Sequence, residues 1–261
     1  MHTKNTGKKT VTILLTCIFL SAVLIFGAKF LFYHVSDTEN VWYFSGDTAQ
    51  RMENIDELPD SALNGYDSLM VVAHPDDETI WGGAHLLEGR YVVVCITNGN
   101  NRTRRKEFQS VMNETGSVGL MLSFPDKTHG KRDDWISCQK QIRQTIDTIV
   151  SRKDWSVIAT HNSKGEYGHI HHQMTSAATT DAVRKQDLDD RLYYFGTYVK
   201  EKNMNKEKYQ SYLTDELTGE VFTQKLSLTK SYASQGKVMD HLGHMLPYEN
   251  WTPAFQSASP H

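Results

Sequence analysis

Short apolar runs alternate with amphipathic segments through the middle of the chain. Four continuous apolar runs are typical of strands buried on both faces of a sheet, and they span residues 68–73, 91–96, 119–122 and 157–160. Between and after them, helical spacing of apolar residues predicts helices over residues 79–87, 104–115, 136–152 and 169–185. This alternation indicates right-handed βαβ units. We therefore expect an α/β fold, a Rossmann-like three-layer arrangement around a mostly parallel sheet.

The pattern is less regular toward the C-terminus, where it predicts a strand over residues 191–198 and a helix over residues 225–244. Ligands of open α/β sheets bind at the carboxyl ends of the strands. The loops that follow the four apolar strands are therefore the places to search for chemistry.

The N-terminal segment has a different character. Residues 10–28 contain no charged side chain, and three lysines precede them. An apolar stretch of about 20 residues is long enough to cross a bilayer, and the lysines favour a cytoplasmic N-terminus. We expect a single-pass signal anchor over residues 1–35, with a cleaved signal peptide as the alternative. A stalk over residues 36–65 would then lead to an extracytoplasmic domain over residues 66–261.

Composition narrows the class of protein. With 28 Lys and Arg against 31 Asp and Glu, the formal net charge is −3, which excludes a strongly basic nucleic-acid binder. The three cysteines, at positions 17, 95 and 138, match neither a disulfide framework nor a CxxC metal motif. Any metal ion must therefore be held by histidines and carboxylates.

The sequence His74-Pro75-Asp76-Asp77-Glu78 directly follows the first apolar strand. Two adjacent carboxylates beside an imidazole at the mouth of a buried strand are costly without a cation. An acid there could simply cap the following helix, but capping explains one carboxylate and leaves the other groups without a role. No GxGxxG motif follows this strand, so a dinucleotide site loses its main support.

A second histidine-rich segment, residues 161–172, follows the fourth strand. His169 and His172 lie three residues apart on one face of the predicted helix, which suits two metal ligands or one ligand and one proton-transfer group. His171 points away from that face, and we expect it to face solvent.

The two segments together carry a resemblance. Ala73-His74-Pro75-Asp76-Asp77-Glu78, followed by Gly165-Glu166-Tyr167-Gly168-His169-x-x-His172, resembles the PIG-L/LmbE family of zinc-dependent N-deacetylases. Members of this family remove acetyl groups from N-acetylglucosaminyl compounds. The similarity covers roughly residues 66–186, with a weaker match at Tyr232-x-Ser234-Gln235. It implies an N-acetylated amino-sugar substrate and a Zn²⁺ ion, with Fe²⁺ or another divalent cation as the alternative.

The resemblance also implies a role for each motif residue. His74, Asp77 and His172 would bind zinc, Asp76 would be the general base, and His169 would stabilise the oxyanion. Two histidines and one aspartate leave a coordination position open for water, the layout of a hydrolytic zinc site.

Three further residues fall at positions where the family has functional side chains. Asp126 resembles the carboxylate that orients His169 and would keep it protonated. Arg104 falls where the family has an arginine for sugar hydroxyls, and Tyr167 where some members have a mobile tyrosine. The chain departs from the family at Ile170-His171, where Pro-Asp is common, so the local carboxylate is lost.

The remaining candidates have less specific interpretations. We expect four other histidines to be loop, rim or surface residues: His129, His161, His241 and His244. Of these, His161 ends a strand beside the site. Three tryptophans are expected to pack in the core or on the surface rather than against sugar: Trp81, Trp135 and Trp251.

Together, these patterns predict a membrane-anchored, metal-dependent N-deacetylase that acts on an N-acetylglucosamine-containing substrate outside the cytoplasmic membrane. A glycan- or metal-binding module without catalysis is the main alternative. An Fe(II) oxygenase triad is a third, although those ligands usually lie on an all-β barrel. No pattern indicates a nucleic-acid partner or a particular oligomeric state.

Overall fold

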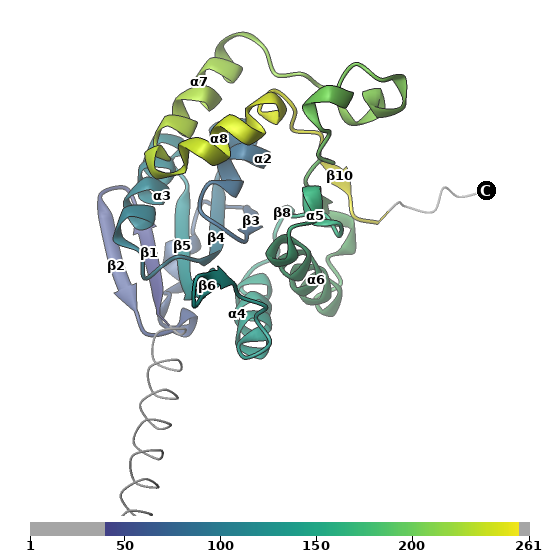
Figure 1. The fold of residues 1–261 in the computed structure, drawn as a ribbon. Coiled ribbons are helices and arrows are strands. Elements are labelled where there is room, and N and C mark those ends of the chain that lie inside the picture. The colour runs from purple at the N-terminus through teal and green to yellow at the C-terminus, as the bar shows by residue number, and fades with distance from the viewer. Residues whose placement is uncertain (1–39, 256–261) are drawn as a thin grey trace, which may run out of the picture. The chain divides into compact units, whose positions relative to one another are not determined.

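A mixed eight-stranded sheet forms the centre of the computed structural model, which describes residues 40–255 (Figure 1). The strands lie in the order β10-β9-β8-β3-β4-β5-β1-β2. Their bounds are β1 Val41–Ser45, β2 Thr48–Met52, β3 Ser68–Val72, β4 Tyr91–Thr97, β5 Val118–Phe124, β8 Val157–Thr160, β9 Leu192–Tyr194 and β10 Thr252–Pro253. A separate hairpin pairs β6 (Lys127–Thr128) with β7 (Lys131–Arg132).

Helices connect the strands. The α-helices are α2 Asp77–Glu88, α3 Arg102–Thr115, α4 Gln139–Ser151, α5 Gly165–Gly168, α6 Ile170–Lys185, α7 Gly219–Lys230 and α8 Gly236–Leu242. Short 3₁₀ helices are η1 Ile55–Glu57, η2 Asp60–Leu63, η3 Asp189–Arg191, η4 Glu201–Asn203, η5 Glu207–Tyr212, η6 Ala233–Gln235 and η7 Gly243–Met245.

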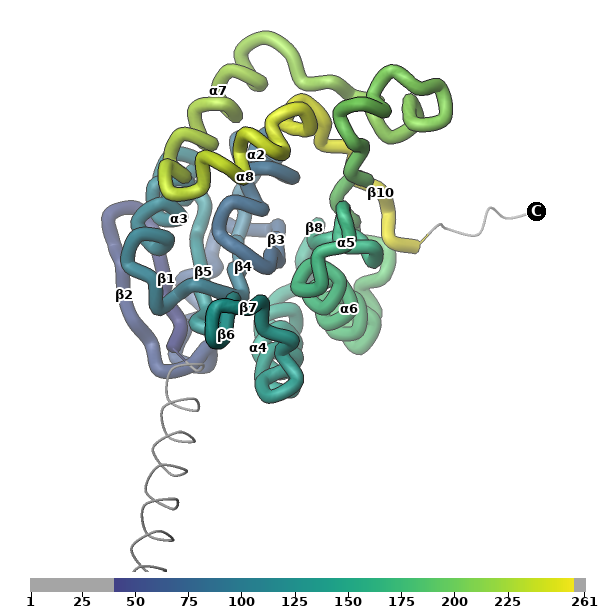
Figure 2. Tube along the Cα trace, viewed as in Figure 1, coloured from purple at the N-terminus to yellow at the C-terminus, as the bar shows by residue number. Residues whose placement is uncertain are grey.

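The interior of the sheet is parallel and its two edges are antiparallel. Parallel pairs join β9 to β8, β8 to β3, β3 to β4 and β4 to β5. At one edge β1 pairs antiparallel with β5 and β2, and at the other β10 pairs antiparallel with β9 (Figure 2). The predicted α/β fold with a mostly parallel sheet is confirmed, with antiparallel edges that the pattern did not predict.

Alternation along the strands divides the core into two layers, because successive side chains of a strand point to opposite faces. In β3, Leu69 and Val71 join the cluster that α4 and α6 cover. Met70 and Val72 join the cluster that α2, α3 and α7 cover. Both faces of the central strands are therefore buried, which explains their continuous apolar runs.

The predicted helix over residues 225–244 is interrupted. Helix α7 ends at Lys230, and the chain turns through η6 before α8 begins. The turn carries the buried Tyr232 inward, where its hydroxyl lies 2.5 Å from Glu78 Oε1. Ser234 then donates its backbone N–H to Glu107 Oε1. These buried polar contacts, which no periodicity reveals, end the helix.

The segment expected to be a stalk already belongs to the sheet from residue 41. Strand β1 pairs with both β5 and β2, and Val41 and Phe44 are buried. A two-residue turn, Gly46-Asp47, joins β1 to β2, with Gly46 in the left-handed region at φ 54°. Gly-Asp between two β-prone runs is a recognised hairpin signal, so the sequence carried this information.

The structure describes no helix in residues 40–255 that is long and apolar enough to cross a membrane. The predicted anchor over residues 1–35 lies outside the described residues.

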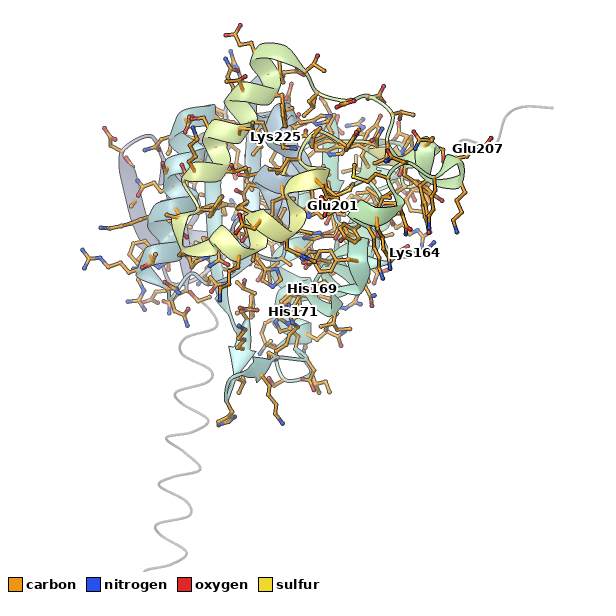
Figure 3. All side chains as sticks on the ribbon, turned by 45° about the horizontal axis from the view of Figure 1, so that its top comes forward. Lys164, His169, His171, Glu201, Glu207 and Lys225 are labelled. Atoms are coloured by element: carbon orange, nitrogen blue, oxygen red, sulfur yellow. The ribbon has the colours of Figure 1, made fainter. Side chains whose placement is uncertain are left out.

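A buried ion pair fixes helix α2, whose first turn begins at Asp77. Lys225 of α7 (Figure 3) is fully buried, and its Nζ lies 2.5 Å from Glu249 Oε1 and 2.9 Å from the Ile80 carbonyl oxygen. Glu249 also accepts the Ala84 backbone N–H and lies 2.6 Å from His85 Nδ1. Helix α7 and the C-terminal segment that carries Glu249 thus hold α2 in place.

We predict that Lys225→Met destabilises the protein by about 3–5 kcal/mol, because it leaves a buried carboxylate without its counter-charge. Urea denaturation of the full-length protein measures this loss. Lys230→Met, an exposed change on the same helix, is the matched control. Equal midpoints for the two variants would contradict the prediction.

The same pair predicts a pH dependence. Burial alone would raise the pKa of Glu249, but Lys225 and His85 lower it from 4.5 to about 2. The depressed pKa means that Glu249 stabilises the fold fully above pH 4.5, and this contribution is lost as the pH falls toward 2. The difference in unfolding free energy between wild type and Glu249→Gln should therefore shrink between pH 4.5 and 2. Glu114→Gln, an exposed change, should show no such trend.

Candidate metal and catalytic site

Neighbouring parallel strands bring the two predicted segments together. Strands β3 and β8 are neighbours that pair in parallel, so their carboxyl ends lie side by side at the same end of the two strands (Figure 1). The loop from β3 into α2 carries His74, Asp76 and Asp77, and the chain after β8 carries His161 and leads into α5 and α6. Segments almost 90 residues apart in sequence therefore share one site, as the sheet topology predicts.

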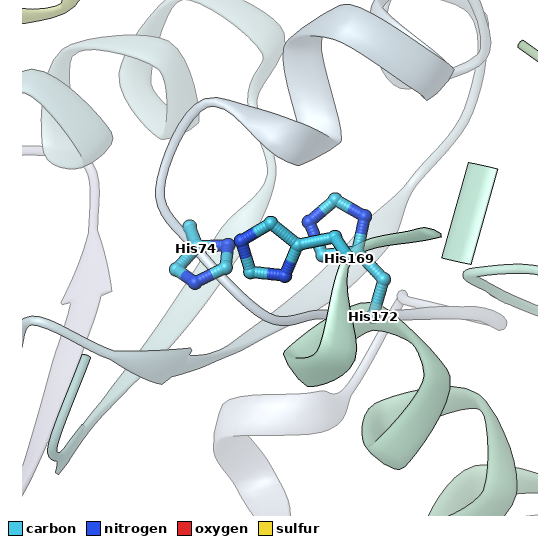
Figure 4. A group of neighbouring side chains, drawn as sticks. All are labelled: His74, His169 and His172. Atoms are coloured by element: carbon cyan, nitrogen blue, oxygen red, sulfur yellow. The ribbon is translucent and has the colours of Figure 1, made fainter. Parts of the chain in front are cut away.

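Oδ2 of Asp77 lies at the centre of this site. It is 3.2 Å from Nδ1 of His74 and 3.3 Å from Nε2 of His172, and it accepts the backbone N–H of His74 at 2.8 Å. One ring nitrogen of His74 lies within 4.8 Å of one of His172, and Figure 4 shows these rings together with that of His169. The three predicted metal ligands are thus neighbours, but they fall in two overlapping groups of potential ligands: His74, His169 and His172, and Asp77, His161 and His172.

The His172 ring shows why a cation fits here. Its Nδ1 lies 2.5 Å from Glu166 Oε2, and a carboxylate only accepts, so Nδ1 carries the proton. In the neutral ring Nε2 is then a bare acceptor; it is buried and has no hydrogen-bond partner among the described residues. It faces Asp77 Oδ2, another acceptor, at 3.3 Å. Two facing acceptors repel each other unless a proton or a metal ion lies between them.

His74 carries a charge that a cation would replace. Burial alone would lower its pKa, but Asp126 and Asp77 raise the pKa of His74 to about 9. The ring is therefore protonated between two carboxylates when no metal is bound. Metal binding releases such protons, because imidazole ligates in its neutral form.

His161 lies in the loop directly after β8, as expected, but it is not a peripheral residue. The ring is fully buried, stacks on His172 at 3.8 Å between centroids, and places Nε2 3.4 Å from Asp77 Oδ2. However, Nε2 accepts the Ala73 backbone N–H at 3.0 Å, so its lone pair is already used. His161 therefore packs against the predicted ligand His172, and its own Nε2 is engaged by the Ala73 N–H.

Glu166 has a role that the sequence did not reveal. Its Oε2 lies 3.1 Å from His161 Nδ1 as well as 2.5 Å from His172 Nδ1, and its Oε1 accepts the Asn162 backbone N–H. Burial alone would raise the pKa of Glu166, but the two imidazoles lower it. Its backbone lies at φ 53°, ψ −74°, a strained conformation of the kind that clusters at functional sites. The sequence signal that could have pointed to Glu166 is its position between His161 and His169.

Asp76 is held in an unusual conformation. It is buried, and its φ of 116° lies in a region that non-glycine residues rarely adopt. Its Oδ2 lies 3.0 Å from Arg104 Nη2. Burial and the neighbouring Asp77 charge raise the pKa of Asp76 to about 8, although Arg104 opposes the shift.

Arg104, expected to contact sugar hydroxyls, lines the pocket but is 5% exposed. Besides Asp76, its guanidinium donates to Glu107 at 2.7 Å, to Ser234 at 3.3 Å and to the Pro75 carbonyl oxygen. Most of its donors are therefore used within the protein. The structure places Arg104 chiefly as the group that holds Asp76.

Asp126 and His169 do not pair as expected. Among the contacts of the described residues, Asp126 Oδ1 lies 3.5 Å from His74 Nε2 and 3.9 Å from His171 Nδ1. His169 Nδ1 instead accepts the His171 backbone N–H at 3.2 Å and lies 3.3 Å from Arg132 Nη1. Burial, together with His172 and His74, lowers the pKa of His169 to about 2. His169 is therefore neutral, with its proton on Nε2, and is not kept charged by Asp126.

His171 was expected to face solvent, and this expectation is also wrong. The ring is fully buried and stacks on Trp135 at 4.0 Å between centroids. Figure 3 shows it beside His169, and the ring centroids are 5.5 Å apart. Trp135, from the loop after β7, covers the face of helix α6 that the helical spacing of its residues assigned to solvent.

Part of this site lines a pocket of about 320 Å³, and the residues described above that line it are His74, Asp76, Asp77, Arg104, Asp126 and His169. Tyr167, 43% exposed, stands at its rim with its ring centroid 5.9 Å from that of His169. Residues outside the predicted set complete the lining: Asn98, Asn101, Lys127, Arg132, Gln235 and Val238. His241 and His244 do not line it. They contact Tyr198, whose ring in turn contacts Tyr167.

The fold and the site define an α/β protein with an imidazole and carboxylate centre, suited to a divalent cation, at the carboxyl ends of parallel strands. Residues 69–183 match the PIG-L family, described as GlcNAc-PI de-N-acetylase, and this part of the chain is a PIG-L family domain. The chain is also 31% identical over 132 residues to uncharacterized protein L374 of Acanthamoeba polyphaga mimivirus. That match covers 44% of this chain and 57% of the relative.

We predict that Glu166→Gln weakens zinc binding about 10- to 100-fold, the usual cost of losing a group that orients a metal ligand. The neutral amide of glutamine is a weaker acceptor for the two imidazole N–H groups than the charged carboxylate of Glu166. The His172 ring is then held less firmly, and its Nε2 is oriented less well toward the ion. Competition with a chromophoric chelator measures the dissociation constant. Glu220→Gln, an exposed change, is the control. An unchanged constant for Glu166→Gln would contradict the role assigned to this carboxylate.

Proposed function

We propose that this protein hydrolyses the N-acetyl group of an N-acetylglucosamine-containing substrate with the help of a divalent cation. The observation that carries the proposal is the bare, buried Nε2 of His172 opposite Asp77 Oδ2 at 3.3 Å. His74, Asp77 and His172 would hold the ion. Zinc suits this nitrogen and oxygen set, and Fe²⁺ is the alternative. When bound, the ion supplies Lewis acidity, which lowers the pKa of water and polarises an amide carbonyl.

Asp76 is the group that moves the proton. Its carboxylate is fixed by Arg104 at 3.0 Å and lines the pocket. A pKa of about 8 lies near neutral pH, so the carboxyl group can both take up a proton and return it. Asp76 accepts a proton as the water oxygen bonds to the acetyl carbon, and returns it to the nitrogen as the C–N bond breaks. The products are acetate and a free amine.

His169 acts as a neutral hydrogen-bond donor in this proposal. With Nδ1 accepting from the His171 N–H and from Arg132, the proton resides on Nε2. That N–H can donate to the carbonyl oxygen as negative charge develops on it, which stabilises the transition state. Arg132 keeps the ring in this tautomer and adds positive charge nearby.

The dimensions and lining of the pocket support a sugar substrate. A volume of about 320 Å³ is at the lower end of ligand sites, roughly 300–1,000 Å³, so it suits one sugar ring. Asparagine, glutamine, lysine and arginine side chains in the lining can hydrogen-bond hydroxyl groups. Tyr167 at the rim offers an aromatic face on which a sugar ring can pack.

The cellular location is part of the proposal. The uncharged stretch over residues 10–28 and the lysines before it support a membrane anchor with the active site outside the cytoplasm. The substrate would then be an amino sugar of the cell surface or its surroundings.

A binding module without catalysis would use the same ligands but has no use for Asp76. The strained φ of 116° and the buried contact with Arg104 maintain a carboxylate beside, and not within, the predicted ligand set. Such strain is costly, and a proton-transfer role accounts for it. The Fe(II) oxygenase alternative expects an all-β barrel, whereas the sheet here is mostly parallel with helices between its strands.

We predict that the purified protein releases acetate from an N-acetylglucosaminyl compound, and that a chelator abolishes and Zn²⁺ restores this activity. Mass spectrometry across GlcNAc, chito-oligomers and GlcNAc-lipids detects loss of the acetyl group. Asp76→Asn should lower the rate at least about 100-fold, the contribution of a general base, with zinc content unchanged. Asp47→Asn, in the exposed β1–β2 turn, is the control. Zinc binding without deacetylation of any of these compounds would favour a binding module instead.

A further inference from the structure

The side chain of His171 has no part in the proposed reaction, yet it has a partner at each ring nitrogen and a ring stacked on its face. It is fully buried and lies parallel to Trp135, with an interplanar angle of 6°. Both ring nitrogens have partners: Nε2 lies 2.7 Å from the Asp133 carbonyl oxygen, and Nδ1 lies 3.1 Å from His74 Nε2. The partner of Nδ1 is a predicted metal ligand.

The chemistry of these partners fixes where the protons lie. A carbonyl oxygen only accepts, so His171 Nε2 must carry a proton and donate it to Asp133. In the neutral ring Nδ1 is then a bare acceptor, and it faces Nε2 of His74 at hydrogen-bond distance. His74 must therefore carry a proton on Nε2 and donate it to His171. The nitrogen left for a metal ion is Nδ1, which lies 3.2 Å from Asp77 Oδ2.

The loop that supplies the carbonyl group is itself fixed. The Asp133 backbone N–H donates to the Asp126 carbonyl oxygen at 3.0 Å, and Thr128 Oγ1 lies 2.5 Å from Asp133 Oδ2. Trp135 donates its indole N–H to the Pro125 carbonyl oxygen at 2.7 Å. The acceptor for His171 and the ring that stacks on it thus belong to one hydrogen-bonded loop, so the position of His171 is determined on both sides.

We propose that His171 is a positioning residue for metal binding: it accepts the Nε2–H of His74 and so presents Nδ1 of that ring to the cation. The inference rests on the proposed function for the identity of the site. It deepens that function by assigning a chain of hydrogen bonds from His74 through His171 to the Asp133 carbonyl oxygen. Groups that hold the outer nitrogen of a ligating histidine fix its tautomer and orientation. In this chain a neutral imidazole fills that role.

Two neighbours offer alternatives that the geometry disfavours. Asp126 Oδ1 could accept the same proton, but it is 3.5 Å from His74 Nε2, farther than His171 at 3.1 Å. The ring nitrogens of His74 and His171 and a carboxylate oxygen of Asp126 also lie within 4.8 Å of one another, a spacing compatible with a second metal ion. That ion would need a bare Nε2 on His74, whereas one neutral imidazole has a single bare nitrogen.

A pair of variants with side chains of similar size tests the proposal. His171→Asn keeps an acceptor near the position of Nδ1, and His171→Leu removes it. We expect His171→Leu to raise the zinc dissociation constant about 10- to 100-fold, and His171→Asn to recover most of that loss. Chelator competition on the full-length protein measures both constants. In ¹⁵N spectra of the zinc-loaded wild type, His74 should carry its proton on Nε2.

Other outcomes would overturn the inference. Equal weakening in both variants would mean that His171 only fills space, and unchanged constants would mean that it does not position His74. Two zinc ions per wild-type chain, with one lost in both variants, would make His171 a ligand. Equal thermal midpoints of the two variants in chelator control for folding. Because zinc binding is measured without substrate, failure to find deacetylase activity would leave this test intact and count only against the proposed function.

Discussion

The site depends on two acceptor atoms that face each other in a buried place. Nε2 of His172 and Oδ2 of Asp77 are 3.3 Å apart, and Nε2 is buried and without a hydrogen-bond partner among the described residues. An arrangement of this kind is stable only if positive charge is shared between the two atoms. Without a metal ion, the protonated His74 provides part of that charge. In the proposed metal-bound state both acceptors would be ligands, and His74 would give up a proton.

The scaffold maintains this arrangement through groups that never touch the ion. Glu166 fixes the proton of His172 on Nδ1. Arg104 holds Asp76 close to the predicted ligands without making it one of them. Helix α2, whose first residue is Asp77, is held from the opposite side by the Lys225–Glu249 pair. Rigidity of the supporting groups matters because catalytic geometry tolerates only small displacements.

The sequence predicted the features that follow from a repeating apolar pattern or from the position of a motif at the end of a strand. It did not predict the features that depend on contacts between segments far apart in the chain. The central strands and the convergence of His74, Asp77 and His172 follow from apolar runs and parallel topology, and both were predicted. The burial of His171 was not, because Trp135 comes from a distant loop and covers the helix face that solvent would otherwise occupy. The assumed contact between Asp126 and His169 failed for the same reason, since Asp126 lies nearer to His74.

Three imidazoles of the site, those of His161, His169 and His172, present different ring atoms because the hydrogen-bond partners of their other nitrogens differ. His172 donates to a carboxylate and leaves Nε2 bare, and His161 donates to the same carboxylate but spends its Nε2 on the Ala73 N–H. His169 accepts at Nδ1 and is left with a donor. Identical side chains are thus suited to three different roles, which we propose are a metal ligand, a supporting group and a hydrogen-bond donor. Because each tautomer is set by an acceptor or donor outside the site, changes in those outer groups alter the chemistry without removing any residue that meets the substrate.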